Sequence, residues 1–358
     1  MFDFIKKNKK KTKAAGATKK TSSVVENYDG ENVLEITNLG IRFDTDTDVV
    51  YAVNGVNLKL KRQSTLGLVG ETGAGKTTTV LSLLNLVPDP PGVITSGQIL
   101  VNGRDVRQMS DDELEEMRGK EISMIFQDPM TALNPVMTVG DQIAESIYLH
   151  EDVTKEESME LAKKMLETVG ISGDRAGDYP HQFSGGMKQR VVIAIALACH
   201  PSILIADEPT TALDVTIQAQ VLDMMKDLKE KYQTSMIMIT HDLGIVAETC
   251  DEVAVMYAGR IVEQGTLEEV FNSTLHPYTE GLFNSLPNMK DRTAKLTPIK
   301  GLIPDPTIQY PGCVFAERCP YATEKCTNGY PAEKWFSDTH MVACCAYDDP
   351  EFHIARGH

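Results

Sequence analysis

The sequence has no long hydrophobic run, a single Trp, and fewer basic than acidic residues outside its first residues. The longest uncharged apolar stretch, Val191–Cys199, is far shorter than the roughly 20 residues that cross a bilayer as a helix. Residues 1–20 hold eight Lys and one acidic residue, whereas the whole chain has 35 basic and 51 acidic residues. The acidic body argues against a nucleic-acid-binding protein, which needs a basic face.

The N-terminal segment also lacks the apolar core and the small-residue cleavage site of an export signal. We therefore expect residues 1–31 to form a Lys-rich disordered arm, either solvated or resting on anionic lipid headgroups. The absence of an export signal predicts a cytoplasmic body. With 42% hydrophobic and 24% charged residues, the composition is that of a globular protein and excludes disordered and fibrous classes.

Strand and helix patterns alternate from about residue 33 to residue 285, which predicts an α/β core. Ser64–Val69 reads as a short strand and Lys76–Leu86 as a helix, with a Gly-rich turn between them. From Leu286 onward Pro, Gly, Cys and polar residues dominate. With 358 residues, we expect two domains or one large domain with an appendage. The predicted regions are the arm 1–31, an α/β domain 32–285 with a mostly helical part at about 128–182, and a C-terminal extension 286–358.

The Gly-rich turn, Gly70-Glu71-Thr72-Gly73-Ala74-Gly75-Lys76-Thr77, fits the phosphate-binding pattern G-x-x-x-x-G-K-[ST] in its required context between strand and helix. Its glycines allow consecutive N–H groups to surround a β-phosphate, and the helix adds its positive end. Lys76 is expected near the β- and γ-oxygens, and the Thr77 hydroxyl is a candidate Mg²⁺ ligand. Thr78 is predicted to bind nucleotide as well.

A second candidate site lies about 130 residues later, where the predicted strand Ser202–Ala206 ends in two carboxylates. We predict that Asp207 reaches a metal ion directly or through water, and that Glu208 orients the water that attacks the γ-phosphate. The alternative is a strand that simply ends in Asp-Glu-Pro.

A third motif, Phe183-Ser184-Gly185-Gly186-Met187-Lys188-Gln189-Arg190, resembles the signature of ATP-binding cassette (ABC) ATPases and lies upstream of the Asp207-Glu208 strand as in that family. Phe183 and Met187 replace the usual Leu and Gln. The resemblance implies that Ser184, Gly185 and Gly186 face nucleotide. It further implies a Q-loop Gln127, a D-loop Thr211-Ala212-Leu213-Asp214, a switch His241 that contacts the γ-phosphate, and a Tyr51 that stacks on adenine.

The resemblance implies an ABC-type nucleotide-binding domain with a RecA-like core, an antiparallel β subdomain and a helical subdomain. It also implies ATP hydrolysis with Glu208 and His241 as catalytic residues and Mg²⁺ held by Thr77, Gln127 and Asp207. Because the chain has one phosphate loop and one signature, two subunits would have to pair to complete two sites. A soluble ABC ATPase acting on DNA or ribosomes is the alternative, but the zinc knuckles, long heptad arms or second cassette of such proteins are not seen in the sequence.

Residues 276–346 resemble the extension of ABC subunits that serve oligopeptide and dipeptide importers. The similar motifs are His276-Pro277-Tyr278-Thr279, Pro304, Pro311-Gly312-Cys313, Phe315, Arg318-Cys319-Pro320, Cys326 and Val342-Ala343-Cys344. The resemblance implies a peripheral ATPase on the cytoplasmic face of the membrane. Its implied partners are a second ATPase subunit, two transmembrane permease subunits and an extracellular or periplasmic peptide-binding protein. A nickel or other small-solute importer is one alternative, and a soluble ABC ATPase with a regulatory iron–sulfur site is another.

Five of the seven cysteines lie within 33 residues of this extension. Cys313, Cys319, Cys326 and Cys344 follow the spacing C-x5-C-x6-C-x17-C, without the closely spaced pairs of a zinc ribbon. Such wide spacing suits four thiolates around a [4Fe–4S] cluster, with which the resembled family is associated. Zinc or unliganded thiols are the alternatives, and Cys345 is expected to be a bystander.

Overall fold

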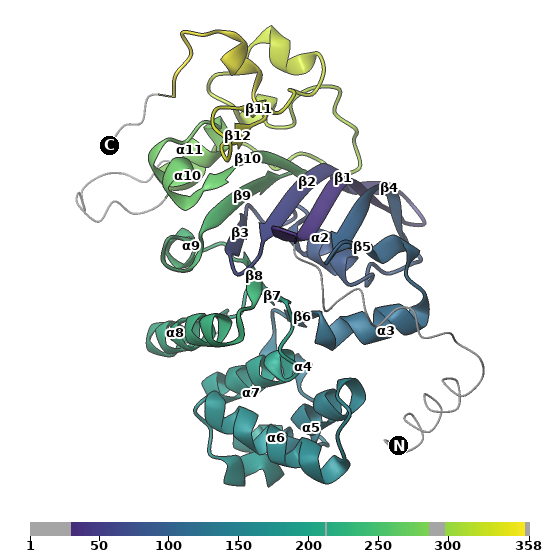
Figure 1. The fold of residues 1–358 in the computed structure, drawn as a ribbon. Coiled ribbons are helices and arrows are strands. Elements are labelled where there is room, and N and C mark those ends of the chain that lie inside the picture. Colours follow the sequence, from purple (N-terminus) through teal and green to yellow (C-terminus); the bar gives the residue numbers. More distant parts are fainter. Residues whose placement is uncertain (1–29, 212, 286–297, 355–358) are drawn as a thin grey trace. The chain divides into compact units, whose positions relative to one another are not determined.

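The computed structural model describes residues 30–211, 213–285 and 298–354 (Figure 1). The expected arm 1–31 lies almost entirely outside the described residues, as do Ala212 of the expected D-loop and the expected boundary near residue 286. The described residues form two compact units whose segments alternate along the chain. Unit 1 has the residues up to Leu34, Lys61–Gln63 and Leu100–Met236, and unit 2 has Glu35–Leu60, Ser64–Ile99 and the chain from Ile237.

Unit 2 contains strands from two sheets. In one sheet the order is β2 (Val49–Lys61), β1 (Asn32–Asp44) and β4 (Gly92–Val101). In the other, β3 (Thr65–Val69) pairs in parallel with β9 (Glu252–Tyr257), and β9 pairs antiparallel with β10 (Arg260–Thr266). The short strands β12 (Met341–Val342) and β11 (Lys334–Trp335) extend this sheet, which joins the C-terminal residues to the α/β core of the unit.

The helices of unit 2 are short. They are α2 (Lys76–Leu83), α9 (Leu243–Thr249), α10 (Leu267–Asn272) and α11 (Pro277–Asn284), with α10 beside β10 (Figure 1). Beyond α11 the described chain has only the two short strands and three single-turn helices, Ala316–Arg318, Glu324–Thr327 and Cys345–Asp348. This part of the extension is therefore irregular, as its composition predicts.

Unit 1 is built around β6 (Ile122–Ile125) and β7 (Ile203–Asp207), which pair in parallel. A short strand, β5 (Arg104–Asp105), precedes them, and β8 (Ser235–Ile239) begins in unit 1 and ends in unit 2. Every residue of β7 and β8 is buried, as expected for strands covered on both faces. The predicted strands Ser202–Ala206 and Ser235–Ile239 are thus confirmed to within one residue.

The helices of unit 1 are α3 (Asp111–Lys120), α4 (Pro129–Ala132), α5 (Val139–His150), α6 (Lys155–Thr168), α7 (Gly185–Leu197) and α8 (Val215–Tyr232). All elements between Pro129 and Gln182 are helical, with two single-turn helices at Gly173–Gly177 and Pro180–Gln182, and α5 packs against α6 (Figure 1). Thr154 begins α6 with a capping box to Glu157, which is a strong sequence signal for a helix start. The mixed α/β fold class is confirmed.

Candidate active site

The phosphate loop connects the end of β3 to the start of α2 in unit 2. Gly70 has φ 151° and a Cβ there would lie 2.1 Å from the carbonyl oxygen of Met256. Gly75 has φ 100° and its Cβ would lie 2.4 Å from the carbonyl oxygen of Ala52. Only glycine fits at these two positions, because the loop backbone packs directly against neighbouring backbone.

Lys76 is the first residue of α2 and its side chain is buried. Its Nζ donates hydrogen bonds to the carbonyl oxygens of Gly70 (2.7 Å) and Glu71 (3.0 Å). The N-cap residue of α2 is Gly75, so no side chain at that position accepts a hydrogen bond from the first N–H groups of the helix. These are the N–H groups with which a helix N-terminus binds an anion. Thr77 is exposed at the same helix start.

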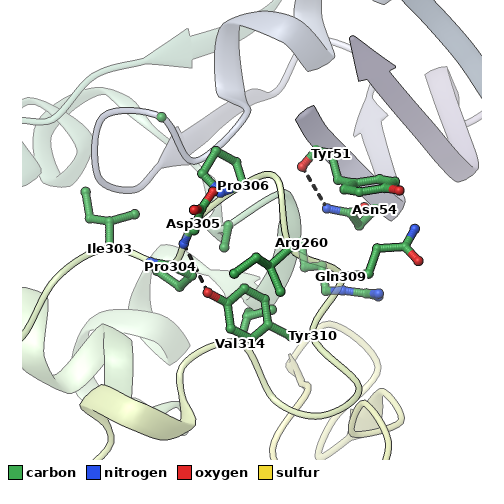
Figure 2. A pocket seen from close by; sticks show the side chains of 13 residues that line it. Tyr51, Asn54, Arg260, Ile303, Pro304, Asp305, Pro306, Gln309, Tyr310 and Val314 are labelled. Atoms are coloured by element: carbon green, nitrogen blue, oxygen red, sulfur yellow. Dashed lines mark hydrogen bonds between the residues drawn. The ribbon is translucent and has the colours of Figure 1, made fainter. Parts of the chain in front are cut away.

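Tyr51 and Gly73 line the same cavity, which has a volume of about 550 Å³ (Figure 2). The Tyr51 amide donates to the carbonyl oxygen of Pro306 (2.8 Å), and its own carbonyl accepts from Nδ2 of Asn54 (3.2 Å). Most of the other lining residues come from the extension, namely Ile303, Pro304, Asp305, Pro306, Ile308, Gln309, Tyr310 and Val314. Within unit 2 the extension therefore reaches both the predicted adenine platform and the phosphate loop.

His241 follows β8 in unit 2 and is exposed. The other predicted catalytic residue, Glu208, and the predicted metal ligand Asp207 lie in unit 1, at the end of β7. Asp207 is the last residue of that strand and is only 4% exposed, while Glu208 follows it in a left-handed backbone conformation with φ 48°. Nε2 of Gln127 donates to Oε2 of Glu208 (2.9 Å). The structure thus brings the predicted Q-loop residue and the predicted catalytic carboxylate into direct contact.

The signature residues lie at the N-terminus of α7, also in unit 1. The Ser184 side chain caps this helix by accepting from the amide of Met187 (3.4 Å). A Cβ at Gly185 would meet no atom within 4 Å, whereas one at Gly186 would lie 2.6 Å from Cγ2 of Ile217 in α8. The two glycines therefore differ: Gly185 faces open space and Gly186 allows α7 and α8 to approach.

Asp214 is the N-cap of α8 and accepts from the amide of Ile217 (3.0 Å). This local role explains an acidic residue at the start of α8. Thr211, which the sequence placed in the D-loop without a role, donates from Oγ1 to Oε2 of Glu208 (3.0 Å). A strand-end carboxylate followed by a hydroxyl three residues later is the only sequence signal for this contact.

The structure also shows a contact of the phosphate loop that the sequence analysis missed. Arg318 of the extension binds the Glu71 carboxylate with two nitrogens, at 2.7 and 3.0 Å. Arg318 and Glu71 are 247 positions apart in the sequence. The sequence around Arg318 was of interest only for Cys319 and gave no reason to connect the extension to the loop. No local pattern reports such a contact.

The cysteines of the extension interact, although they do not form a ligand set for a metal ion. The amide of Cys313 donates to the carbonyl of Cys326 (2.8 Å). Burial raises the pKa of Cys319 and of Cys344 to about 12, and nearby thiols add to the increase. Across residues 30–211, 213–285 and 298–354, however, no group of three or more His, Cys, Asp or Glu side chains is arranged to hold a metal ion. The arrangement therefore gives the predicted cluster no support.

Two family profiles match the sequence. The profile described as ABC transporter matches residues 53–211, and the profile described as oligopeptide/dipeptide transporter, C-terminal region, matches residues 262–326. The dipeptide transport ATP-binding protein DppD of Bacillus subtilis is 49% identical over 325 residues, which cover 90% of this chain and 97% of that protein. The oligopeptide transport ATP-binding protein OppD of the same organism is 51% identical over 313 residues, 87% of each chain.

Among solved structures, the dimeric post-hydrolysis state of the ATP-binding cassette MJ0796 bound to ADP and Pi matches with a TM-score of 0.59 and 26% identity. The match covers 65% of this chain and 98% of that one. Fold and motifs together define an ATPase of the ABC class. More narrowly, the chain belongs to the family of ABC transporter ATP-binding proteins that carry the oligopeptide/dipeptide C-terminal region. The expected family and ATPase activity are confirmed, and in the described parts of the chain no helix is long and apolar enough to span a membrane.

Proposed function

We propose that this protein hydrolyses ATP to drive the import of dipeptides or oligopeptides through a membrane ABC transporter. The observation that carries the proposal is that one chain matches both the ABC cassette and the oligopeptide/dipeptide C-terminal region. Relatives that match almost end to end are named for dipeptide and oligopeptide transport. A nickel or other small-solute importer is less favoured because none of these names mentions such a cargo.

The residues divide into binding and catalytic roles. In unit 2, the phosphate-loop N–H groups and Lys76 bind the β- and γ-phosphates, while Tyr51 stacks on adenine and His241 contacts the γ-phosphate. In unit 1, Glu208 orients and polarises the attacking water. Its support is the position directly after buried Asp207 and the hydrogen bond from Gln127.

Magnesium would be held by oxygen groups, which are the ligands that this ion prefers. Thr77, Gln127 and Asp207 are the candidates, and a hydroxyl, an amide and a carboxylate fit the ion chemically. Bound there, the ion offsets negative charge on the β- and γ-phosphates.

Two ATPase subunits would complete each ATP site, with the signature of one subunit facing the phosphate loop of the other. The exposed start of α7 at Ser184 and Gly185 supports this arrangement, since a Cβ at Gly185 meets nothing within its own chain. The two matched structures of the cassette MJ0796 are described as dimeric. The second subunit is a copy or a paralogue. Asp214, at the exposed N-terminus of α8, would lie at the same interface.

The remaining partners are two transmembrane permease subunits and a peptide-binding protein outside the membrane. The ATPase would sit on the cytoplasmic face, with the helical residues 128–175 receiving a permease segment. A role on nucleic acid is not proposed, because the chain is acidic overall with a net charge of −16.

We further propose that Cys313, Cys319, Cys326 and Cys344 hold a structural [4Fe–4S] cluster. Their spacing is the support for this, and a direct test is needed because the described side chains are not arranged to hold a metal ion. The test is metal analysis of protein purified without oxygen, with Cys345→Ala as the control variant. About four iron atoms per chain and broad absorption near 400 nm would support the cluster, whereas zinc or a colourless protein would refute it.

The transport proposal is tested by reconstituting the ATPase with its permease subunits and binding protein in vesicles. ATPase activity is then measured with dipeptides, with oligopeptides and with Ni²⁺ presented to the binding protein. Peptide-stimulated hydrolysis that disappears in Glu208→Gln is the expected result. Stimulation by Ni²⁺ alone would contradict the peptide cargo while leaving the ATPase assignment intact.

A further inference from the structure

Arg318 of the extension is almost completely buried in unit 2, with 5% of its side chain exposed, and its guanidinium donates hydrogen bonds to a carboxylate, a hydroxyl and a carbonyl. Two of its nitrogens hold the two oxygens of the Glu71 carboxylate, and Nη1 also donates to the Tyr257 hydroxyl (3.1 Å). Its Nε donates to the carbonyl oxygen of Lys300 (3.2 Å). This is a bidentate Arg–carboxylate pair, the geometry in which an ion pair is strongest and most directional.

The partner of this arginine is the second residue of the phosphate loop. Besides its carboxylate, Glu71 uses its amide to donate to the Tyr278 hydroxyl (2.8 Å), and its carbonyl accepts from Lys76 Nζ (3.0 Å). Both its side chain and its backbone are therefore fixed. Fixing this residue sets where the following N–H groups of the loop point.

The support behind Arg318 is rigid. Phe315, three residues earlier, is 2% exposed and packs edge-on against Tyr257 and Tyr278, with ring centroids 5.2 and 5.5 Å apart. Tyr257 and Tyr278 also contact each other at 4.5 Å. The two hydroxyls that bind Arg318 and Glu71 thus belong to one packed aromatic cluster.

The pair also has an electrostatic consequence. Glu71 is the one acidic residue between Gly70 and Thr77, in a loop that has to bind a polyphosphate anion. A carboxylate without its cation there would repel the ligand, whereas a carboxylate in a bidentate pair contributes little net charge.

We infer that Arg318 is a positioning residue of the ATP site: through Glu71 it holds the phosphate loop in its binding shape and neutralises the loop's only acid. The extension is then part of the nucleotide site rather than an appendage that could be removed without effect on ATP. The inference rests on the proposed role of residues 70–77 in binding ATP.

The test measures the affinity of the full-length protein for a fluorescent ATP analogue, together with its thermal unfolding without nucleotide. Arg318→Ala should weaken binding more than about tenfold, the effect of losing a charged hydrogen-bonded pair. Arg318→Lys, which keeps the charge but not the two-point geometry, should lie in between. Lys334→Ala removes a cation from another ion pair of the extension, with Asp348, and should leave affinity unchanged.

The double variant Arg318→Ala/Glu71→Gln shows whether a loss of ATP affinity in Arg318→Ala comes from the unpaired Glu71 carboxylate or from a general loss of stability. Removing the unpaired acid should restore part of the lost ATP affinity, and in the assembled transporter Arg318→Ala should raise KM for ATP more than it lowers kcat. Unchanged affinity in Arg318→Ala, or a loss that Glu71→Gln leaves as it was, would overturn the inference. If Arg318→Ala does not fold, wild-type affinity in Arg318→Lys would do the same. Failure of the wild-type protein to bind the analogue would instead refute the role of the loop itself.

Discussion

Gln127 and Glu208, 81 residues apart in the sequence, meet through a 2.9 Å hydrogen bond from the amide nitrogen to Oε2 of the carboxylate. The Thr211 hydroxyl donates to the same oxygen at 3.0 Å. Two donors on one oxygen fix how the carboxylate is turned, and they also link it to the loop that follows β6. Substitution of either Gln127 or Glu208 should therefore lower the rate of ATP hydrolysis.

Glu208→Gln should abolish most turnover while leaving ATP binding in place, because the amide is the same size but is a much weaker base. We expect kcat to fall roughly 10²–10⁴-fold, the usual effect of losing such a group. In the proposed dimer ATP contacts both ATPase subunits. The variant, which binds ATP but does not hydrolyse it, should therefore accumulate as a closed dimer that size-exclusion chromatography detects. Turnover close to that of the wild type would refute the role of Glu208.

Gln127→Ala should lower kcat less, by roughly three- to tenfold, since it removes a hydrogen bond to the carboxylate and one of three candidate Mg²⁺ ligands rather than the carboxylate itself. The measurement is steady-state ATPase activity at saturating ATP. Gln108→Ala is the matched control, because it removes an amide that binds only a surface carboxylate, Asp105, in the same unit. Equal rates in both variants would show that the contact with Glu208 does not matter for hydrolysis.

The adjacent glycines of α7 provide a matched pair of substitutions. Gly186→Ala should destabilise the protein by about 1–3 kcal/mol, because its methyl group would push Ile217 away from α7. Gly185→Ala meets nothing within the chain, so its melting temperature should stay close to that of the wild type. A loss of ATPase activity in Gly185→Ala without loss of stability would locate its role at the partner subunit, whereas full activity would contradict that role.

Local motifs predicted most of the strands and helices that carry the site. The strand before the phosphate loop and the helix from Lys76 are confirmed as β3 and α2, although α2 ends at Leu83 rather than Leu86. The helix stops early because Asn85, with φ 49°, has left the helical conformation. Contacts such as Arg318 with Glu71 could not be predicted, because nothing in the neighbouring sequence of either residue encodes its distant partner.

His276 gives a prediction for pH. It is 1% exposed, and its Nδ1 accepts from the Tyr278 amide (3.0 Å) at the start of α11. Burial lowers its pKa to about 3, below the value of about 6.5 for an exposed histidine. Its contribution to stability is therefore complete above pH 6.5 and is lost progressively as the pH falls from 6.5 towards 3.

Urea unfolding between pH 7 and pH 4 measures this effect. The free energy of unfolding of the wild type should fall with a slope of up to about one proton per molecule in this range. In His276→Asn, whose side-chain oxygen still caps the helix but does not titrate, this part of the slope should be absent. Parallel curves for the two proteins would contradict the assignment.

The left-handed backbone conformation of Glu208 lowers the stability of the fold at the same residue whose carboxylate is needed for hydrolysis. A side chain in that conformation costs about 1 kcal/mol relative to glycine, yet the strain occurs where the carboxylate is required. Glu208→Gly would consequently relax the chain while removing its base. Random screening for heat resistance would tend to select inactive proteins at this residue, so a more robust transporter ATPase has to be sought elsewhere in the chain.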